Sequence, residues 1–316
     1  MVQNLPDLIN KFSNEADCRA FLVQQRWDGS PVCPYCGCEK WYSIEGGKRF
    51  KCGSRDCYKK YSVTVGTVFE ASNIPLTKWF PALYLLTAHK KGISSVQLAK
   101  DLGVSQKTAW FMKMRIRESL KEKGSSLLGG TVEVDETYIG GKIKNKHKKV
   151  RDAAKGKSGS HTFNKTGVMG LISRESTLKV EVIDSTKKTL REMVSKHVDN
   201  SATVITDSLN AYSLLSRDYS AHQIVKHDKD EFVRGSFHTN TIEGFFSYLK
   251  RSIYGIYHNV SPKHLQRYCD ENAYRYNLRG MKDGERFELS LQGITGRLSY
   301  KKLVYGIDTK EKSSEA

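Results

Sequence analysis

Three acidic residues of this 316-residue chain stand where metal chemistry would require them. Asp135 lies in the alternating segment TVEVDETYIG, Asp207 ends the strand-like segment ATVITD, and Glu243 lies in the helix-like segment TNTIEGFFSYLKRS. Carboxylates from two strands and a following helix can hold two divalent cations, because hard cations prefer oxygen ligands. Each residue also has a simpler interpretation: Asp135 as an exposed strand residue, Asp207 as a turn or cap residue, and Glu243 as part of a helix cap.

The helix predicted around Glu243 carries further polar residues on the same edge. Its buried side is predicted by apolar residues at helical spacing: Ile242, Phe245, Phe246 and Leu249. Seven residues are nearly two helical turns, so Lys250 projects from the same edge as Glu243, with Asn240 close beside them. Asn240 and Glu243 also fit a capping box, in which Asn240 caps the first N–H groups and Glu243 reaches back. His238 precedes the helix closely enough to contact a phosphate or support a ligand, although a lone histidine is more often structural.

Cysteine spacing indicates a second metal site near the N-terminus. Five of the seven cysteines fall between residues 33 and 57, and in a reducing compartment such a cluster favours metal ligation over disulfides. A C-x2-C pair, fifteen further residues and a C-x4-C pair predict two hairpin knuckles around one structural Zn²⁺. The expected ligands are Cys33, Cys36, Cys52 and Cys57, with Cys38 as a rival to Cys36. Cys18 and Cys269 lie in helical patterns and are expected to be small buried hydrophobic residues.

Two helices predicted within residues 75–122 have a pattern typical of DNA-binding proteins. SSVQLAKDLG and SQKTAWFMKMRIRESL are joined at Gly103-Val104-Ser105, where glycine permits a sharp bend and serine can cap the second helix. The pair indicates a helix-turn-helix, although two helices that merely pack together would show the same pattern. The second helix would offer donors to base edges and phosphates: Gln106, Lys107, Thr108, Lys113, Arg115 and Arg117.

The charge of the chain points to a polyanionic partner. Lys plus Arg number 52 against 34 Asp plus Glu, which gives a formal charge of +18 and an isoelectric point near 9.5. No run of eighteen apolar residues and no signal-peptide pattern is present, so a soluble, cytoplasmic and nucleoid-associated protein is expected. The loop 141–162 is especially basic, with eight Lys or Arg and one Asp between residues 142 and 157. It is either a solvated loop or a phosphate-contacting arm that uses Lys148, Lys149 and Arg151.

The pattern of elements predicts a multidomain α/β protein. After a linker near residue 125, three strands, a helix, a strand and a helix follow in order, which implies a sheet covered by helices. The expected divisions are an N-terminal helical segment (1–29), a zinc ribbon (30–70), a helix-turn-helix region (75–122), an α/β catalytic domain (130–282) and a C-terminal tail (283–316).

Several segments together resemble one family. VEVDETYIGG, VITDSLNAY and HTNTIEGFFSYLKRSIYGIYHNVSPKHLQRY resemble, in order, the three blocks of bacterial insertion-sequence DDE transposases of the ISXO-like type, and RWDGSPVCPYCG resembles their zinc ribbon. The likeness covers nearly the whole chain, and Lys250 stands where that family places a basic residue after the glutamate. The resemblance implies an RNase H-like mixed-sheet catalytic domain in which Asp135, Asp207 and Glu243 bind two Mg²⁺ or Mn²⁺ ions. Relatives use Asn or Glu as the third ligand, and Glu243 is expected over Asn240 because a hard cation prefers a carboxylate.

The function implied by the resemblance is transposition of DNA. The expected partners are the terminal inverted repeats of the element and the target DNA, and the expected reaction is Mg²⁺-dependent strand cleavage and transfer. A homodimer or larger assembly is expected, because a transposase must hold two ends together. Two alternatives stay open: a DNA-binding regulator or domesticated transposase without activity, and an RNase H-like nuclease that does not join strands.

Overall fold

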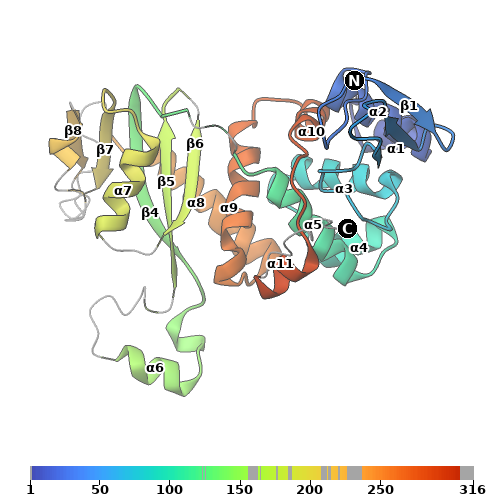
Figure 1. Cartoon of the computed structure of the whole chain (residues 1–316). Coiled ribbons are helices and arrows are strands. Elements are labelled where there is room, and N and C mark those ends of the chain that lie inside the picture. Colours follow the sequence, from blue (N-terminus) through green and yellow to red (C-terminus); the bar gives the residue numbers. More distant parts are fainter. Residues whose placement is uncertain are drawn as a thin grey trace. The chain divides into compact units, whose positions relative to one another are not determined.

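The structure is a computed structural model, and it describes residues 2–122, 124, 126–155, 163, 165–175, 177–183, 187–207, 212, 215–219, 221–225 and 237–306. Of residues 187–189 it describes the backbone only. The chain divides into two compact units (Figure 1): the N-terminal unit, residues 1–121 with 278–316, and the central unit, residues 122–277. None of the helices in these described ranges is long and apolar enough to cross a membrane.

The N-terminal unit combines helices with one small antiparallel sheet in the order β1-β2-β3. Asn4 and Asn14 begin the first two helices, and each side chain accepts hydrogen bonds from backbone N–H groups of the first turn. In chain order its elements are α1 (Leu5–Lys11), α2 (Glu15–Trp27), β1 (Trp41–Ile44), β2 (Arg49–Cys52), β3 (Lys60–Tyr61), α3 (Leu76–Ala88), α4 (Ser95–Leu102), α5 (Gln106–Ser119), α10 (Asp283–Gln292) and α11 (Tyr300–Tyr305).

The prediction of a C-terminal tail is wrong for the described part of residues 283–316. This part contains α10 and α11, and α10 packs on α2 and α3. The ring of Phe287 lies 5.7 Å from that of Phe80, and both side chains are fully buried. At Gly284 an added Cβ would come within 1.7 Å of the carbonyl oxygen of Val2, so only glycine fits there. Residues at both ends of the chain therefore build one core.

The helix pair α4–α5 has the local geometry that its sequence predicts. Gly103 ends α4 in the left-handed region, with φ 58° and ψ 49°, which glycine adopts at little cost. Ser105 begins α5, and its Oγ accepts a hydrogen bond of 3.1 Å from the N–H of Thr108. The bend and the cap are confirmed, whereas the DNA-reading role stays a prediction.

The central unit is built on a mixed sheet with the strand order β6-β5-β4-β7-β8. β5 runs antiparallel to both of its neighbours, β4 and β6, while β7 and β8 run parallel to β4, as expected for an RNase H-like domain. In chain order its elements are β4 (Thr131–Ile139), η1 (Ile143–Asn145), α6 (Lys148–Ala154), β5 (Thr166–Ser173), β6 (Leu178–Ile183), α7 (Lys187–His197), β7 (Thr203–Asp207), η3 (Leu215–Arg217), β8 (Ala221–Val225), α8 (Asn240–Ser252), the π-helix η5 (Ile253–Tyr257) and α9 (Pro262–Asn277).

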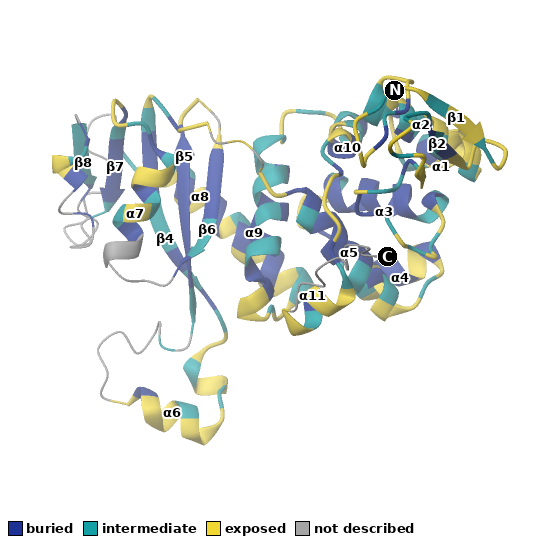
Figure 2. Cartoon of the chain, viewed as in Figure 1, coloured by how far each residue is buried: buried dark blue, intermediate teal, exposed yellow. Residues whose placement is uncertain are grey.

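Helices cover both faces of this sheet, and each face has its own apolar core (Figure 2). On one face α7 packs over Val132, Val134 and Leu171, while on the other α8 and α9 pack over Val168 and Ile172. Because side chains alternate along a strand, even-numbered residues of β4 face α7 and odd-numbered residues face α8. The odd-numbered face carries Asp135.

Candidate active site and zinc site

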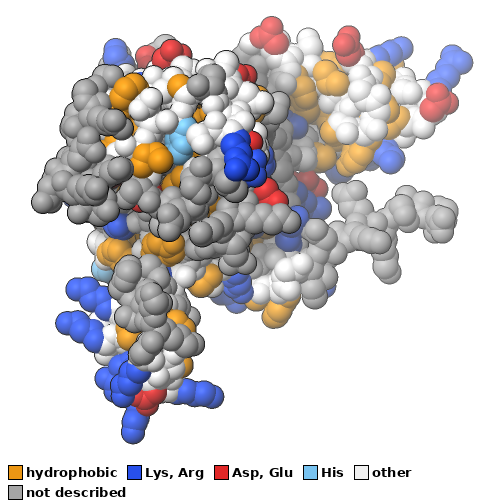
Figure 3. Space-filling view, turned by 90° about the vertical axis from the view of Figure 1, so that its left-hand side faces the viewer, with side chains coloured by type: hydrophobic (Ala, Val, Ile, Leu, Met, Phe, Trp, Pro, Cys, Tyr) orange, Lys and Arg blue, Asp and Glu red, His pale blue; other side chains and the backbone are white. Residues whose placement is uncertain are grey.

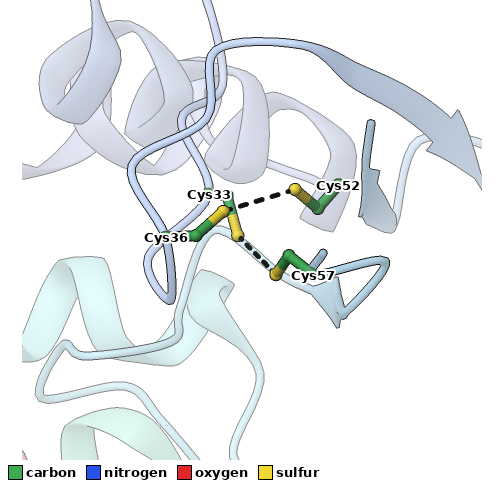
Figure 4. Close-up of side chains that lie close together, drawn as sticks. All are labelled: Cys33, Cys36, Cys52 and Cys57. Carbon is green, nitrogen blue, oxygen red and sulfur yellow. Dashed lines mark hydrogen bonds between the residues drawn. The ribbon is translucent and has the colours of Figure 1, made fainter. Parts of the chain in front are cut away.

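The four cysteines expected to bind zinc converge in the N-terminal unit (Figure 4). Their Sγ atoms all lie within 4.8 Å of one another, with 3.8 Å between Cys33 and Cys57 and 3.5 Å between Cys36 and Cys52. Tetrahedral Zn²⁺ with Zn–S bonds of about 2.3 Å places its sulfurs about 3.8 Å apart, whereas a disulfide requires about 2.05 Å. The Cys38 thiol instead points to the carbonyl oxygen of Lys40, 3.7 Å away, so Cys36 completes the set. Cys18 and Cys269, as expected, are buried.

Asp135 and Asp207 lie side by side on neighbouring parallel strands. The ladder between β4 and β7 pairs Thr131 with Thr203 and ends with Glu133 paired to Ile205. Continued two residues further, this register leads to Asp135 and Asp207, and the charge of Asp207 acts on the Asp135 carboxyl. Neighbouring strands are about 4.8 Å apart. The sheet therefore brings together, at one level, two carboxylates that lie 72 positions apart in the chain.

Glu243 reaches the same face on α8, which packs on β4 and β5. Gly170 makes this close packing possible, because it is the register partner of Asp135 and an added Cβ would lie 2.5 Å from Cδ1 of Ile242. Glu243 is exposed, and its Oε1 accepts a hydrogen bond of 2.8 Å from the hydroxyl of Thr239. Among the residues that the structure describes, only the cysteines converge within 4.8 Å, so the three carboxylates form a more open group.

The electrostatics of Asp135 mark this open group as rich in negative charge. Burial, followed by the nearby charges of Glu136, Asp207 and Glu243, raises the pKa of Asp135 to about 8. Glu136 points to the opposite face, where its Oε2 accepts a hydrogen bond of 2.6 Å from the hydroxyl of buried Tyr212; burial raises its pKa as well. Glu136 and Tyr212 were not expected as part of this environment.

Glu133 is a further residue of the site whose role the sequence did not predict. Its fully buried carboxylate accepts hydrogen bonds from the backbone N–H groups of Thr241 and Ile242, at 3.0 and 3.2 Å, and from the Thr241 hydroxyl at 2.9 Å. Glu133 therefore caps the N-terminus of α8 from the neighbouring strand. Its position two residues before Asp135, on the same face of a buried strand, is a signal that could have pointed to it.

The interpretation of Asn240 as the helix cap is wrong. The helix begins at Asn240, and its N-cap residue is Thr239. The Thr239 side chain accepts no hydrogen bond from the N–H groups of the first turn. Asn240, Glu243 and Lys250 are all exposed, as expected for residues on one helix edge. His238 Nδ1 lies 3.4 Å from Glu133 Oε1, which places His238 beside the cap rather than among the three carboxylates.

Comparisons with known proteins agree with this geometry. Residues 127–277 match the model of the ISXO2-like transposase domain, and residues 13–60 match that of the transposase zinc-ribbon domain. A relative described as an uncharacterized protein in the transposable element ISH50, from Halobacterium salinarum, is 31% identical over 254 residues, which cover 77% of this chain and 84% of the relative. The chain belongs to the ISXO2-like transposases. The zinc ribbon and the mixed sheet are those of an insertion-sequence transposase.

The predicted DNA-reading residues of this transposase fall into two groups. At the start of α5, Gln106 and Lys107 are exposed and Thr108 is half-exposed. The prediction is wrong for the other three residues, because their cationic side chains are buried: Lys113, Arg115 and Arg117. The Lys113 ammonium donates to the carbonyl of Ile93, and the Arg115 guanidinium donates to the carbonyl of Glu70 at 2.5 Å.

The basic segment of the transposase presents its cations to solvent. Lys148, Lys149 and Arg151 are exposed on α6, which follows η1 after the end of β4. Figure 3 shows Lys and Arg side chains projecting around this segment. Residues 156–162 of the expected basic loop lie outside the described residues.

Proposed function

We propose that this transposase cleaves DNA at the ends of its element and transfers the freed strand, with Asp135, Asp207 and Glu243 as the ligands of two Mg²⁺ or Mn²⁺ ions. The observation that supports the proposal is the register of β4 and β7, which, continued two residues beyond the Glu133–Ile205 pair, leads to Asp135 and Asp207 on the face covered by α8. The pKa of Asp135 is raised chiefly by burial, and the negative charges of Asp207 and Glu243 add to the rise. A divalent cation would offset these charges, so the residues fit such ions.

Each residue of the site then has a distinct task. When bound, paired divalent cations activate the attacking oxygen and stabilise the leaving oxygen of a phosphodiester. Asp135 and Asp207 offer their oxygens from a rigid sheet, and Glu243 offers its own from the first turn of α8. Glu133 holds that turn against β4 through its hydrogen bonds to Thr241 and Ile242.

DNA binding is proposed for three exposed elements of the transposase. The zinc ribbon and the start of α5, with Gln106 and Lys107, contact the element ends. The cations of α6 contact phosphates without regard to sequence: Lys148, Lys149 and Arg151. Replacing these three by alanine should weaken binding to all duplexes and reduce the salt slope by about 0.9 for each phosphate that is no longer neutralised.

The catalytic assignment is tested by single alanine variants of the three acids. Asp135→Ala, Asp207→Ala and Glu243→Ala should each lower strand transfer by on the order of 10³-fold or more, because each removes a cation ligand, while binding to the DNA that flanks the gene persists. Transfer is measured on a pre-nicked terminal duplex, so that cleavage without joining would reveal a nuclease instead.

Two variants on the same helix edge provide the comparison. Asn240→Ala should change neither stability nor transfer appreciably, because Asn240 does not cap α8. Ser247→Ala, at another exposed position of α8, is the matched control. If Glu243→Ala retains transfer and Asn240→Ala abolishes it in folded protein, the amide is the third ligand and the assignment of Glu243 is wrong.

A further inference from the structure

The central unit contains a pocket of about 670 Å³ that the roles given above leave unused. Its volume falls within the range of roughly 300–1,000 Å³ that is usual for small-molecule sites. The end of β4 with the loop that follows it, the residue before β5, and the α8–η5 segment form its walls. The side chains that matter are Tyr138, Lys142, Lys144, Lys165, Lys250 and Tyr254.

The charge of this pocket selects an anion. Four lysines line it, and among the described residues no aspartate or glutamate does. Lys142, Lys144 and Lys250 are exposed, so their ammonium groups are available to a ligand from solution. Four positive charges around one small volume attract phosphate groups strongly.

Two tyrosines make the pocket more than a phosphate site. Tyr254 is 42% exposed and lies in η5, and π-helices occur frequently at functional sites. Its hydroxyl accepts from the N–H of Gly140 and donates to the carbonyl of Gly140, both at 3.2 Å, so the ring is held in one orientation. Aromatic rings held beside cations bind nucleotides, because the base stacks while the cations contact the phosphate.

The position of the pocket relates it to the proposed cleavage site. Lys250 follows Glu243 by seven residues on α8, which is about 10 Å along the helix axis. That distance corresponds to about three steps of duplex DNA at 3.4 Å each. A nucleotide in the pocket would therefore lie close to the bond that is cut.

We propose that this pocket binds one unstacked nucleotide of the element end, within about three positions of the cleaved bond, with its base on Tyr254 and its phosphate on the lysines. The proposal rests on the proposed function, because it takes Glu243 as part of the cleavage site. Base stacking on an aromatic ring strengthens binding by roughly five- to 150-fold, so Tyr254→Ala should weaken binding to terminal duplexes by a factor in that range.

The direct test uses 2-aminopurine at each of three positions on either side of the cleavage site, in duplexes that carry the DNA flanking the gene. Fluorescence is recorded with Ca²⁺ in place of Mg²⁺, so that the signal reports DNA binding and does not depend on cleavage. At one position we expect the fluorescence to differ severalfold from that of the free duplex. This difference should appear with the wild type and with Tyr254→Phe, which keeps the ring. With Tyr254→Ala that position should keep the signal of free duplex while the DNA stays bound. Tyr305→Ala, at a 69% exposed tyrosine, is the control.

The outcomes separate this inference from the proposed function. Normal strand transfer together with an unchanged signal at all six positions would overturn the pocket and leave the chemistry standing. A Tyr254-dependent signal in a protein that cleaves nothing with Mg²⁺ would support the pocket and reject the chemistry. Loss of binding on replacement of Lys142 and Lys144, with no effect of Tyr254→Ala, would make the pocket a path for the DNA backbone and overturn the nucleotide site.

Discussion

Replacement of Glu133 tests how the candidate active site is held together. Its buried carboxylate accepts from two backbone N–H groups and one hydroxyl at the start of α8, and Arg174 Nε donates to it at 3.3 Å. A negative charge at a helix N-terminus contributes up to about 2 kcal/mol when partly buried. Removing one partner from a buried charged network costs about 3–5 kcal/mol. We therefore expect Glu133→Gln to destabilise the central unit by about 1–2 kcal/mol and Glu133→Ala by about 3–5 kcal/mol.

The same changes should reduce activity beyond their effect on stability. Glu243 lies in the first turn of α8, so a loosened N-terminus displaces its carboxylate relative to Asp135. A displacement of about 1 Å lowers a rate by on the order of 10²-fold. Denaturant unfolding gives the stability, and strand transfer at saturating Mg²⁺, at a temperature where both variants are folded, gives the rate.

Glu175→Gln provides the matched control, because Glu175 is an exposed carboxylate after β5. It should leave both quantities unchanged. The reasoning about Glu133 is refuted if Glu133→Ala unfolds at the same denaturant concentration as the wild type. It is also refuted if a folded Glu133→Ala protein transfers strands at the normal rate, since α8 would then be placed without the cap.

Three further predictions concern zinc, DNA and pH. Metal analysis should find about one zinc per chain, and changing Cys33 and Cys36 to serine should release it and unfold the ribbon, as loss of near-ultraviolet circular dichroism would report. Lys107→Ala should weaken binding to terminal duplexes selectively. Lys113→Met should instead lower the free energy of unfolding by about 1–3 kcal/mol and leave the salt slope of DNA binding unchanged. An equal fall of the salt slope in both variants would contradict the burial of Lys113. Because the cation-free pKa of Asp135 is about 8, its carboxyl holds a proton below that pH, so Mg²⁺ affinity should fall about 50-fold between pH 8 and pH 6. Calorimetry in different buffers should detect proton release, and an affinity equal at both pH values would reject this coupling.

Features that depend on neighbouring residues could be predicted from the sequence. The cysteine spacing implied the sulfur cluster, because each knuckle is closed by a few residues of local backbone. The bend at Gly103 and the cap at Ser105 followed from the conformations those residues favour. The alternation of VEVDET correctly placed Glu133 and Asp135 on one face of β4.

Features that depend on distant contacts could not be predicted. The cap on α8 joins residues 108 positions apart, and nothing near either residue indicates the pairing. The cations of α5 were assigned to DNA because the second helix of a helix-turn-helix offers donors to base edges and phosphates, yet Lys113 and Arg115 turn theirs to backbone carbonyls. Similarly, α10 packs on α2 and α3, which lie far from it in the sequence, so its own segment gave no sign that it belongs to a core.

The discontinuity of the N-terminal unit imposes an order on synthesis. Residues 122–277 are complete before residues 278–316 have been translated, and these last 39 residues carry α10, which finishes the core of the N-terminal unit. At 5–20 residues per second they take about 2–8 s to make. Throughout that interval the N-terminal unit lacks α10. A transcript cut short after residue 277 would yield a protein that keeps the three acids but has lost the helix that packs on α3, so its ribbon and its α4–α5 pair would be poorly supported.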